Sequence, residues 1–134
     1  MTAEGGFIGF LALTLVLLAA VVRTGLSARR RLHIPCVAAT LLALGTTIYF
    51  AVQMGEHYDL HSAGAITPIH LWLAKLTTLA YLAPLGTGLL TIRDPTWRAR
   101  HRVCALVVLA LTVLTAVTGT WMVLAAERLP VAGH

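Results

Sequence analysis

The sequence is poor in charged residues and in every motif that catalysis usually needs. Only 11% of its 134 residues are Asp, Glu, Lys or Arg, whereas a soluble domain carries about a quarter. It contains no nucleophile motif, no Gly-rich phosphate loop and no pair of carboxylates within an apolar run. These absences exclude an ordinary water-soluble domain and disfavour a hydrolase or a proton-driven carrier. Catalysis is therefore not the function that the sequence favours.

Apolar residues dominate the composition. They make up 58% of the chain, and the mean hydropathy is +0.84. Four long apolar stretches each approach or exceed the roughly 20 residues that cross a bilayer as a helix. We therefore predict an all-α integral membrane protein with one domain, residues 1–134, folded as a four-helix up-down-up-down bundle. The expected helices are residues 5–24, 33–56, 67–92 and 101–126.

Eight of the ten basic residues lie in two connections between the predicted helices, residues 23–31 and 93–102; the other two are Lys75 and Arg128, and the acidic residues lie mostly elsewhere. Positively charged loops stay in the cytoplasm, so both arginine-rich loops are expected there, with both termini outside the inner (plasma) membrane. The net charge of +5 then reflects topology and contact with the lipid bilayer. No nucleic-acid partner is expected.

Prolines and small residues refine this picture. Thr67 and Pro68 are expected as the N-cap and first residue of the third helix, and Pro35 in the first turn of the second. Pro84 should kink the third helix. Gly5 and Gly9 should give the first helix a packing face.

Small and hydroxyl residues also share a helical face with each of the histidines His33, His70 and His101, so these faces should point into the bundle. The face residues are Cys36, Thr40, Thr47 and Met54; Ala74, Thr77, Tyr81, Pro84 and Gly88; and Ala105, Val108, Thr112, Thr115, Gly119 and Met122.

His33 and His101 each begin a predicted helix directly after a cluster of arginines. The two helices run in the same direction, so both imidazoles are expected at one depth near the cytoplasmic face. Two such imidazoles are suited to be the axial ligands of a b-type haem. The alternative is that each histidine only binds headgroups or loop carbonyls.

His57, His61 and His70 surround the outer loop, together with Glu56 and Asp59. The histidines are candidates for a second haem or for a copper or zinc ion, with the carboxylates orienting the rings. The alternative is a solvated polar loop.

The two cysteines, Cys36 and Cys104, each follow a histidine by three residues. Two His and two Cys side chains form a set suited to zinc or copper. Buried cysteines, however, are commonly inert. Both should lie at the cytoplasmic side, where thiols stay reduced, so a disulfide is not expected.

The segments around these cysteines, residues 29–36 and 98–104, resemble one another: a basic cluster, a histidine, two residues, then a cysteine. Either two helical hairpins arose by duplication, or similar topology signals produced the same pattern by chance.

Four short motifs then resemble those of a known family. They are His70-Leu71-Trp72-Leu73-Ala74, Pro84-Leu85, His101-Arg102 and Thr118-Gly119. Over residues 29–125 the chain is similar to the small four-helix membrane proteins of the CtaM and YozB family. The resemblance implies a role in assembling haem–copper terminal oxidases, with haem binding as the chemistry. The family's Pro-Ile-Trp stretch in the last helix is absent, and either His57 or His61 takes the place of its histidine near the end of the second helix.

Three hypotheses follow. In the first, the chain binds one or two b-type haems in oxidase assembly or in transmembrane electron transfer. In the second, it handles copper for the same assembly. In the third, it is a cofactor-free accessory subunit. The expected partners are subunits of a terminal oxidase or another respiratory complex, or further copies of this chain.

Overall fold

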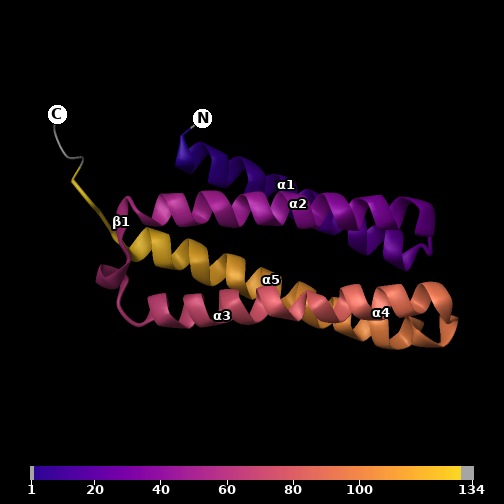
Figure 1. Ribbon diagram of the computed structural model, residues 1–134. Helices are drawn as coiled ribbons and strands as arrows, with labels where there is room; N and C mark the ends of the chain where they lie inside the picture. The colour runs from indigo at the N-terminus through magenta and orange to yellow at the C-terminus, as the bar shows by residue number, and fades with distance from the viewer. Residues whose placement is uncertain (1, 131–134) are drawn as a thin grey trace. The chain divides into compact units, whose positions relative to one another are not determined.

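The computed structural model describes residues 2–130 and is almost entirely helical (Figure 1). The helices are α1 (Ala3–Leu26), α2 (Arg30–Gly55), α3 (Ile66–Ala80), α4 (Leu82–Arg93) and α5 (Arg98–Ala125). Short elements join or follow them: β1 (Tyr58–Asp59), η1 (Leu60–Ala63), η2 (Pro95–Trp97) and β2 (Glu127–Arg128). Within the described residues, four helical stretches are long and apolar enough to span a membrane. The all-helical class and the four candidate spans are thereby confirmed.

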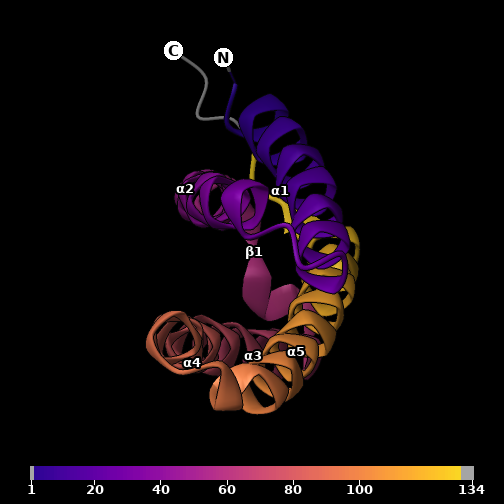
Figure 2. The ribbon, with the colours of Figure 1, turned by 90° about the vertical axis from the view of Figure 1, so that its right-hand side faces the viewer.

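The chain divides into two compact units, which we describe separately: unit 1, Met1–Tyr58, and unit 2, Asp59–His134. Unit 1 is a hairpin of α1 and α2, whereas in unit 2 the single helix α5 packs along both α3 and α4 (Figures 1 and 2). Each unit has one end where an arginine-rich turn joins its helices, which we call its arginine end. We call the opposite end its far end.

Unit 1 is held by contacts along its whole length. Thr2 caps α1 by accepting a hydrogen bond from the Gly5 amide. At the far end, the Tyr58 hydroxyl donates to Glu4 at 3.2 Å. In the middle, the buried hydroxyls of Thr14 and Thr47 lie 3.1 Å apart. Because lipid offers no hydrogen-bonding partner, such hydroxyl pairs join helices inside a membrane.

Unit 2 uses the same kind of polar contact. The hydroxyls of Thr77 on α3 and Thr115 on α5 lie 2.8 Å apart. Tyr81, where the helix breaks, places its hydroxyl 2.9 Å from that of Thr112. At the far end, β1 and β2 form a two-stranded sheet, and the Glu127 amide donates to the Ser62 hydroxyl at 2.7 Å.

Two local predictions were wrong at helix starts. Helix α2 begins at Arg30, so Pro35 lies inside it and not in its first turn. Helix α3 begins at Ile66, and its N-cap position is Ala65. Thr67 is therefore not the cap, and its hydroxyl instead donates to the Leu60 carbonyl. Both helices extend further toward their loops than the apolar pattern indicated, since polar residues also fit a first helical turn.

The break near Pro84 was predicted correctly. The third span is interrupted at Tyr81, which ends α3 and precedes α4. Proline has no amide hydrogen to donate to the carbonyl four residues earlier, at Ala80. The interruption therefore falls one turn before the proline, as the chemistry of the residue requires.

The histidine-bearing faces lie against neighbouring helices, as predicted. Residues of these faces account for most of the buried positions of α2, α3 and α5, among them Thr40, Thr47, Met54, Thr77, Val108, Thr112 and Met122. In α1, however, Gly6 and not Gly5 or Gly9 is the packing residue. A Cβ at Gly6 would come within 2.6 Å of the Phe50 ring, whereas one at Gly9 would meet nothing within 4 Å.

The turn of unit 2 carries its own cap. The Asp94 carboxylate accepts a hydrogen bond from the Thr96 amide at 2.9 Å, and so starts η2. Backbone and side-chain hydrogen bonds from Thr96 hold the pKa of the Asp94 carboxyl below its ordinary value of 3.8.

We expect Gly6→Ala to destabilise the protein by about 1–3 kcal/mol, because the added methyl group overlaps the Phe50 ring. Gly9→Ala is the matched control and should leave stability unchanged or higher, since alanine favours the helix. Thermal unfolding in detergent measures both. Adding Phe50→Leu should restore much of the loss in Gly6→Ala. Equal stability of the two alanine variants would contradict the contact.

The Asp94 cap should depend on pH. Its lowered pKa means that the cap stabilises the fold above the ordinary carboxyl pKa of 3.8 and is lost as pH falls through the lowered value. The amide chemical shift of Thr96, followed by NMR during acidification, should therefore titrate with a midpoint below 3.8. Asp94→Asn should abolish the titration, and a midpoint at or above the ordinary value would refute the cap.

Candidate functional site

His33, at the start of α2, is held by the end of α1. Its Nδ1 lies 3.2 Å from the Thr24 hydroxyl and 3.1 Å from the Val21 carbonyl oxygen. Its ring rests on Gly25, where a Cβ would come within 3.1 Å of the imidazole Cε1. The ring is half-buried. One turn of α1 therefore fixes both the direction and the depth of this imidazole.

His101, at the start of α5, is held by the end of α4 in the same way. Its Nδ1 lies 3.3 Å from the Thr87 hydroxyl and 3.1 Å from the Pro84 carbonyl oxygen. A Cβ at Gly88 would come within 3.2 Å of its Cε1. The distances match those around His33 within 0.1 Å, although the two sites belong to different units.

His70, near the start of α3, shows the arrangement at the far end of unit 2. Its Nδ1 lies 3.1 Å from the Thr118 hydroxyl on α5. The ring packs on Gly119, where a Cβ would come within 2.7 Å of Cε1. We call this arrangement a His–Thr–Gly contact: a histidine Nδ1 bound to a threonine, with its ring on the glycine that follows.

The three contacts fix which ring nitrogen carries the proton. Each threonine already donates its hydroxyl hydrogen to the carbonyl four residues earlier, at Ala20, Ala83 and Leu114. The Val21 and Pro84 carbonyl oxygens beside His33 and His101 are able only to accept a hydrogen bond. The threonine oxygens, whose hydrogens are already used, also act as acceptors toward the imidazoles. Nδ1 must therefore donate, so a neutral ring has its lone pair on Nε2. Nε2 is then the nitrogen that is able to coordinate a metal.

His70 and His101 do not share one site. His101 is near the start of α5, and Thr118, which holds His70, lies 17 residues further along the same helix. At 1.5 Å per residue this corresponds to about 26 Å. The two imidazoles therefore lie at opposite ends of unit 2.

The loop histidines lack such a contact. His57 is exposed, and its Nδ1 lies 3.0 Å from the Gln53 carbonyl of its own chain segment. His61 is exposed in η1, where its amide binds the Asp59 carboxylate. Among residues 2–130, no three His, Cys, Asp or Glu side chains form a group able to hold a metal ion. The structure therefore does not bring His57, His61 and His70 together as a three-ligand metal site within the described residues.

The cysteines likewise form no such group in the described chain. Cys36 and Cys104 are half-buried free thiols, each three residues after the histidine of its own helix. The Thr40 hydroxyl donates to the Cys36 carbonyl, so the contact made there involves the backbone and not the thiol.

The two units carry the same contacts in the same register. From α1 to α3 and α4, matching residues are 63 positions apart: Thr14 and Thr77, Ala20 and Ala83, Val21 and Pro84, Thr24 and Thr87, Gly25 and Gly88. From α2 to α5 the spacing is 68: His33 and His101, Cys36 and Cys104, Thr47 and Thr115, Met54 and Met122. Topology signals do not require such matched contacts, so the register favours duplication of a hairpin over chance resemblance.

The partners of the histidines were missed in the sequence. Their signal was present, since the dipeptide Thr-Gly occurs three times, at residues 24–25, 87–88 and 118–119. Each occurrence lies beneath one of the three histidines. The dipeptide is too short to stand out until its position opposite an imidazole is known.

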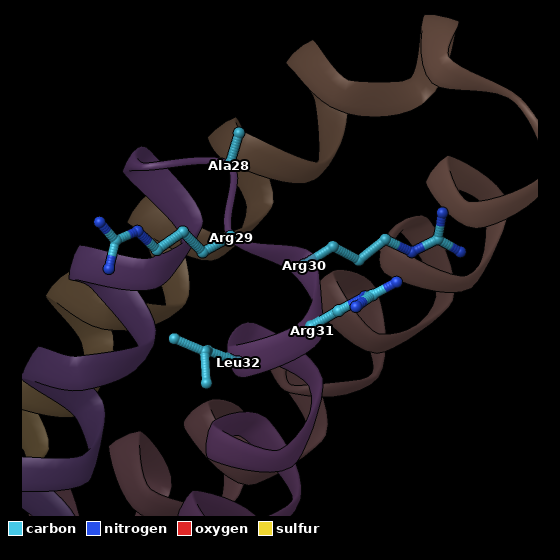
Figure 3. Close-up of a pocket in the computed structure, with 5 residues that line it drawn as sticks. All are labelled: Ala28, Arg29, Arg30, Arg31 and Leu32. Carbon is cyan, nitrogen blue, oxygen red and sulfur yellow. The ribbon is translucent and has the colours of Figure 1, made fainter.

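A surface pocket at the arginine end of unit 1 is separate from these contacts. It is lined by Ala28, Arg29, Arg30, Arg31 and Leu32. Arg30 and Arg31 extend to one side of the turn and Arg29 to the other (Figure 3). Guanidinium groups spread in this way suit anionic headgroups, in keeping with the expected lipid contact.

We expect the protonation described above to be visible by NMR. In metal-free protein with ¹⁵N-labelled histidine, the neutral form of His33, His70 and His101 should be the tautomer with its proton on Nδ1, because Nδ1 donates to fixed acceptors. His61, which is exposed, is the internal control and should exchange between both forms. A neutral ring with its proton on Nε2 and none on Nδ1 would contradict its contact.

Comparison of the chain with models of protein families, with curated proteins and with solved structures finds no match in any of the three.

Proposed function

We propose that this membrane protein binds b-type haem, and that His33, His101 and His70 would hold its iron through Nε2. One observation carries the proposal: the same His–Thr–Gly contact occurs three times, and each time it commits Nδ1 as a donor. Nothing else among the described side chains repeats in this way. A bound haem would supply a one-electron carrier, since its iron cycles between the ferric and ferrous states.

The donor chemistry fits this group. Histidines that ligate a metal commonly donate their second ring nitrogen to a carbonyl or another acceptor, which fixes the ring orientation and raises the basicity of the ligating nitrogen. Here the Val21 and Pro84 carbonyls serve His33 and His101, and hydroxyls assist at all three rings. The residues present therefore suit imidazole ligation of iron.

The glycines argue against a purely structural role. A glycine inside a helix costs about 1 kcal/mol relative to alanine. Gly25, Gly88 and Gly119 each occupy the position where a Cβ would press on an imidazole ring. A histidine needed only to join two helices would not require its ring to lie this close to a backbone in three places. A site that must orient the ring does require it.

The cellular role is proposed on the resemblance stated above. Proteins of the CtaM and YozB family are associated with assembly of haem–copper oxidases, and haem binding would give this chain a corresponding role there or in electron transfer. The arginine-rich turns, proposed to face the cytoplasm by the positive-inside rule, then place His33 and His101 near that side and His70 near the other.

The proposal is tested with protein produced in haem-replete cells and purified in detergent. We expect a Soret band that shifts on reduction with dithionite. His33→Ala, His101→Ala and His70→Ala should each lower the haem content or change the spin state, because each removes an axial imidazole. His61→Ala is the matched control and should leave the spectrum unchanged. A colourless protein, or alanine variants indistinguishable from wild type, would refute the proposal.

A further inference from the structure

The turn of unit 1 concentrates positive charge in a short stretch of the chain. Residues 23–33 contain four arginines and neither Asp nor Glu. Three of these arginines, Arg29, Arg30 and Arg31, line the open pocket at the start of α2. Among the described residues, no side chain caps this helix start. The pocket therefore presents both guanidinium groups and the positive end of a long helix dipole.

The backbone of this turn is fixed by its own hydrogen bonds. The Arg29 amide donates to the Thr24 carbonyl at 3.0 Å. The Ala28 amide donates to the Gly25 carbonyl at 3.2 Å, and these two bonds form the Schellman motif that commonly ends a helix. Ala28 adopts the left-handed conformation that the motif requires, with φ at 52°. The arginines therefore follow directly from a closed turn and not from a long loop.

Two of the three guanidinium groups lie on the same side. Arg30 and Arg31 extend together to one side of the turn, whereas Arg29 extends to the other (Figure 3). Guanidinium groups present planar sets of N–H donors that match phosphate oxygens. The pocket has a volume of about 450 Å³, within the usual range for a small-ligand site. Leu32 adds an apolar side chain to the lining, so the pocket suits a phosphate group with a hydrocarbon chain beside it.

The corresponding turn of unit 2 is built differently. No two arginines are adjacent in residues 93–102, and Asp94 adds a negative charge there. By the spacing of 68 residues, Arg29 corresponds to Trp97. The Arg100 guanidinium lies over the Trp97 ring, 4.7 Å from its centroid, and so makes a cation–π contact within the turn. The two turns carry the same number of arginines, but the adjacent pair belongs to unit 1.

We propose that Arg30 and Arg31 bind the phosphate of one anionic phospholipid headgroup at the start of α2. The helix is a candidate membrane span from Arg30 onward, so the pair lies where headgroups meet the hydrocarbon core. A lipid is the occupant, and not free phosphate, because its acyl chains hold the headgroup at this level and raise its local concentration. The inference does not depend on haem binding.

The test is titration of the purified chain in detergent with phosphatidylglycerol, with bound lipid counted by native mass spectrometry. We expect wild type to prefer phosphatidylglycerol to phosphatidylcholine, whose choline group cancels the phosphate charge. Arg30→Gln combined with Arg31→Gln should weaken phosphatidylglycerol binding about 30-fold at low salt, since each arginine contributes about fivefold. Arg98→Gln combined with Arg102→Gln is the matched control. It removes the same charge from unit 2 and should leave binding nearly unchanged.

A second pair of variants separates the site from the fold. Arg30→Lys combined with Arg31→Lys keeps the charge and should still prefer phosphatidylglycerol. Its binding should be weaker than that of wild type, because an ammonium group lacks the planar set of donors. Thermal unfolding without added lipid should be the same for wild type and for all these variants, so that any difference in binding reports on the pocket.

Three results would overturn the inference. Wild type that binds the two lipids equally would show that the pocket does not recognise an anionic headgroup. Equal losses in the two double glutamine variants would show that the arginines act only as general positive charge. Displacement of phosphatidylglycerol by excess inorganic phosphate at constant ionic strength would show that the occupant is free phosphate. None of these results bears on haem binding, which the Soret band measures independently.

Discussion

The structure depends on how polar side chains are satisfied where no water is present. Within the hydrocarbon region every polar group needs a hydrogen-bonding partner inside the protein. Threonines meet this need by bonding their hydrogen to their own helix and offering their oxygen across the interface, as Thr24 and Thr87 do. The histidine opposite must then donate, so packing and ring protonation are settled by one set of hydrogen bonds. The chemistry of Nε2 follows from that constraint.

The same constraint explains why two hairpins of different sequence look alike in detail. Most lipid-facing positions tolerate any large apolar residue, so they diverge without cost. Positions whose hydroxyls pair across the interface, such as Thr14 with Thr47 and Thr77 with Thr115, are tied to a partner. The matched register therefore survives as a pattern of polar contacts and glycines, and much less as overall similarity.

Much of the fold was predictable from the sequence, because hydropathy and helical periodicity report directly on burial in lipid. The four spans, the histidine-bearing faces and the break before Pro84 all follow from these signals. Helix starts were less predictable, since Thr67 is both a good cap and a good donor to a loop carbonyl. The packing role of Gly6 was missed because it depends on which turn of α1 meets Phe50. The Thr-Gly partners of the histidines were missed for the same reason.

His33 follows Thr24 by nine positions, and His101 follows Thr87 by fourteen. The connections of the two hairpins therefore differ in length by five residues. This extra length lies wholly in the connection, where Asp94 and η2 are found, and the helices on both sides keep their register. Insertion there altered no contact within the membrane. The turn is therefore the place where the two hairpins differ in length, while the contact between histidine and Thr-Gly at the arginine end is the same in each unit.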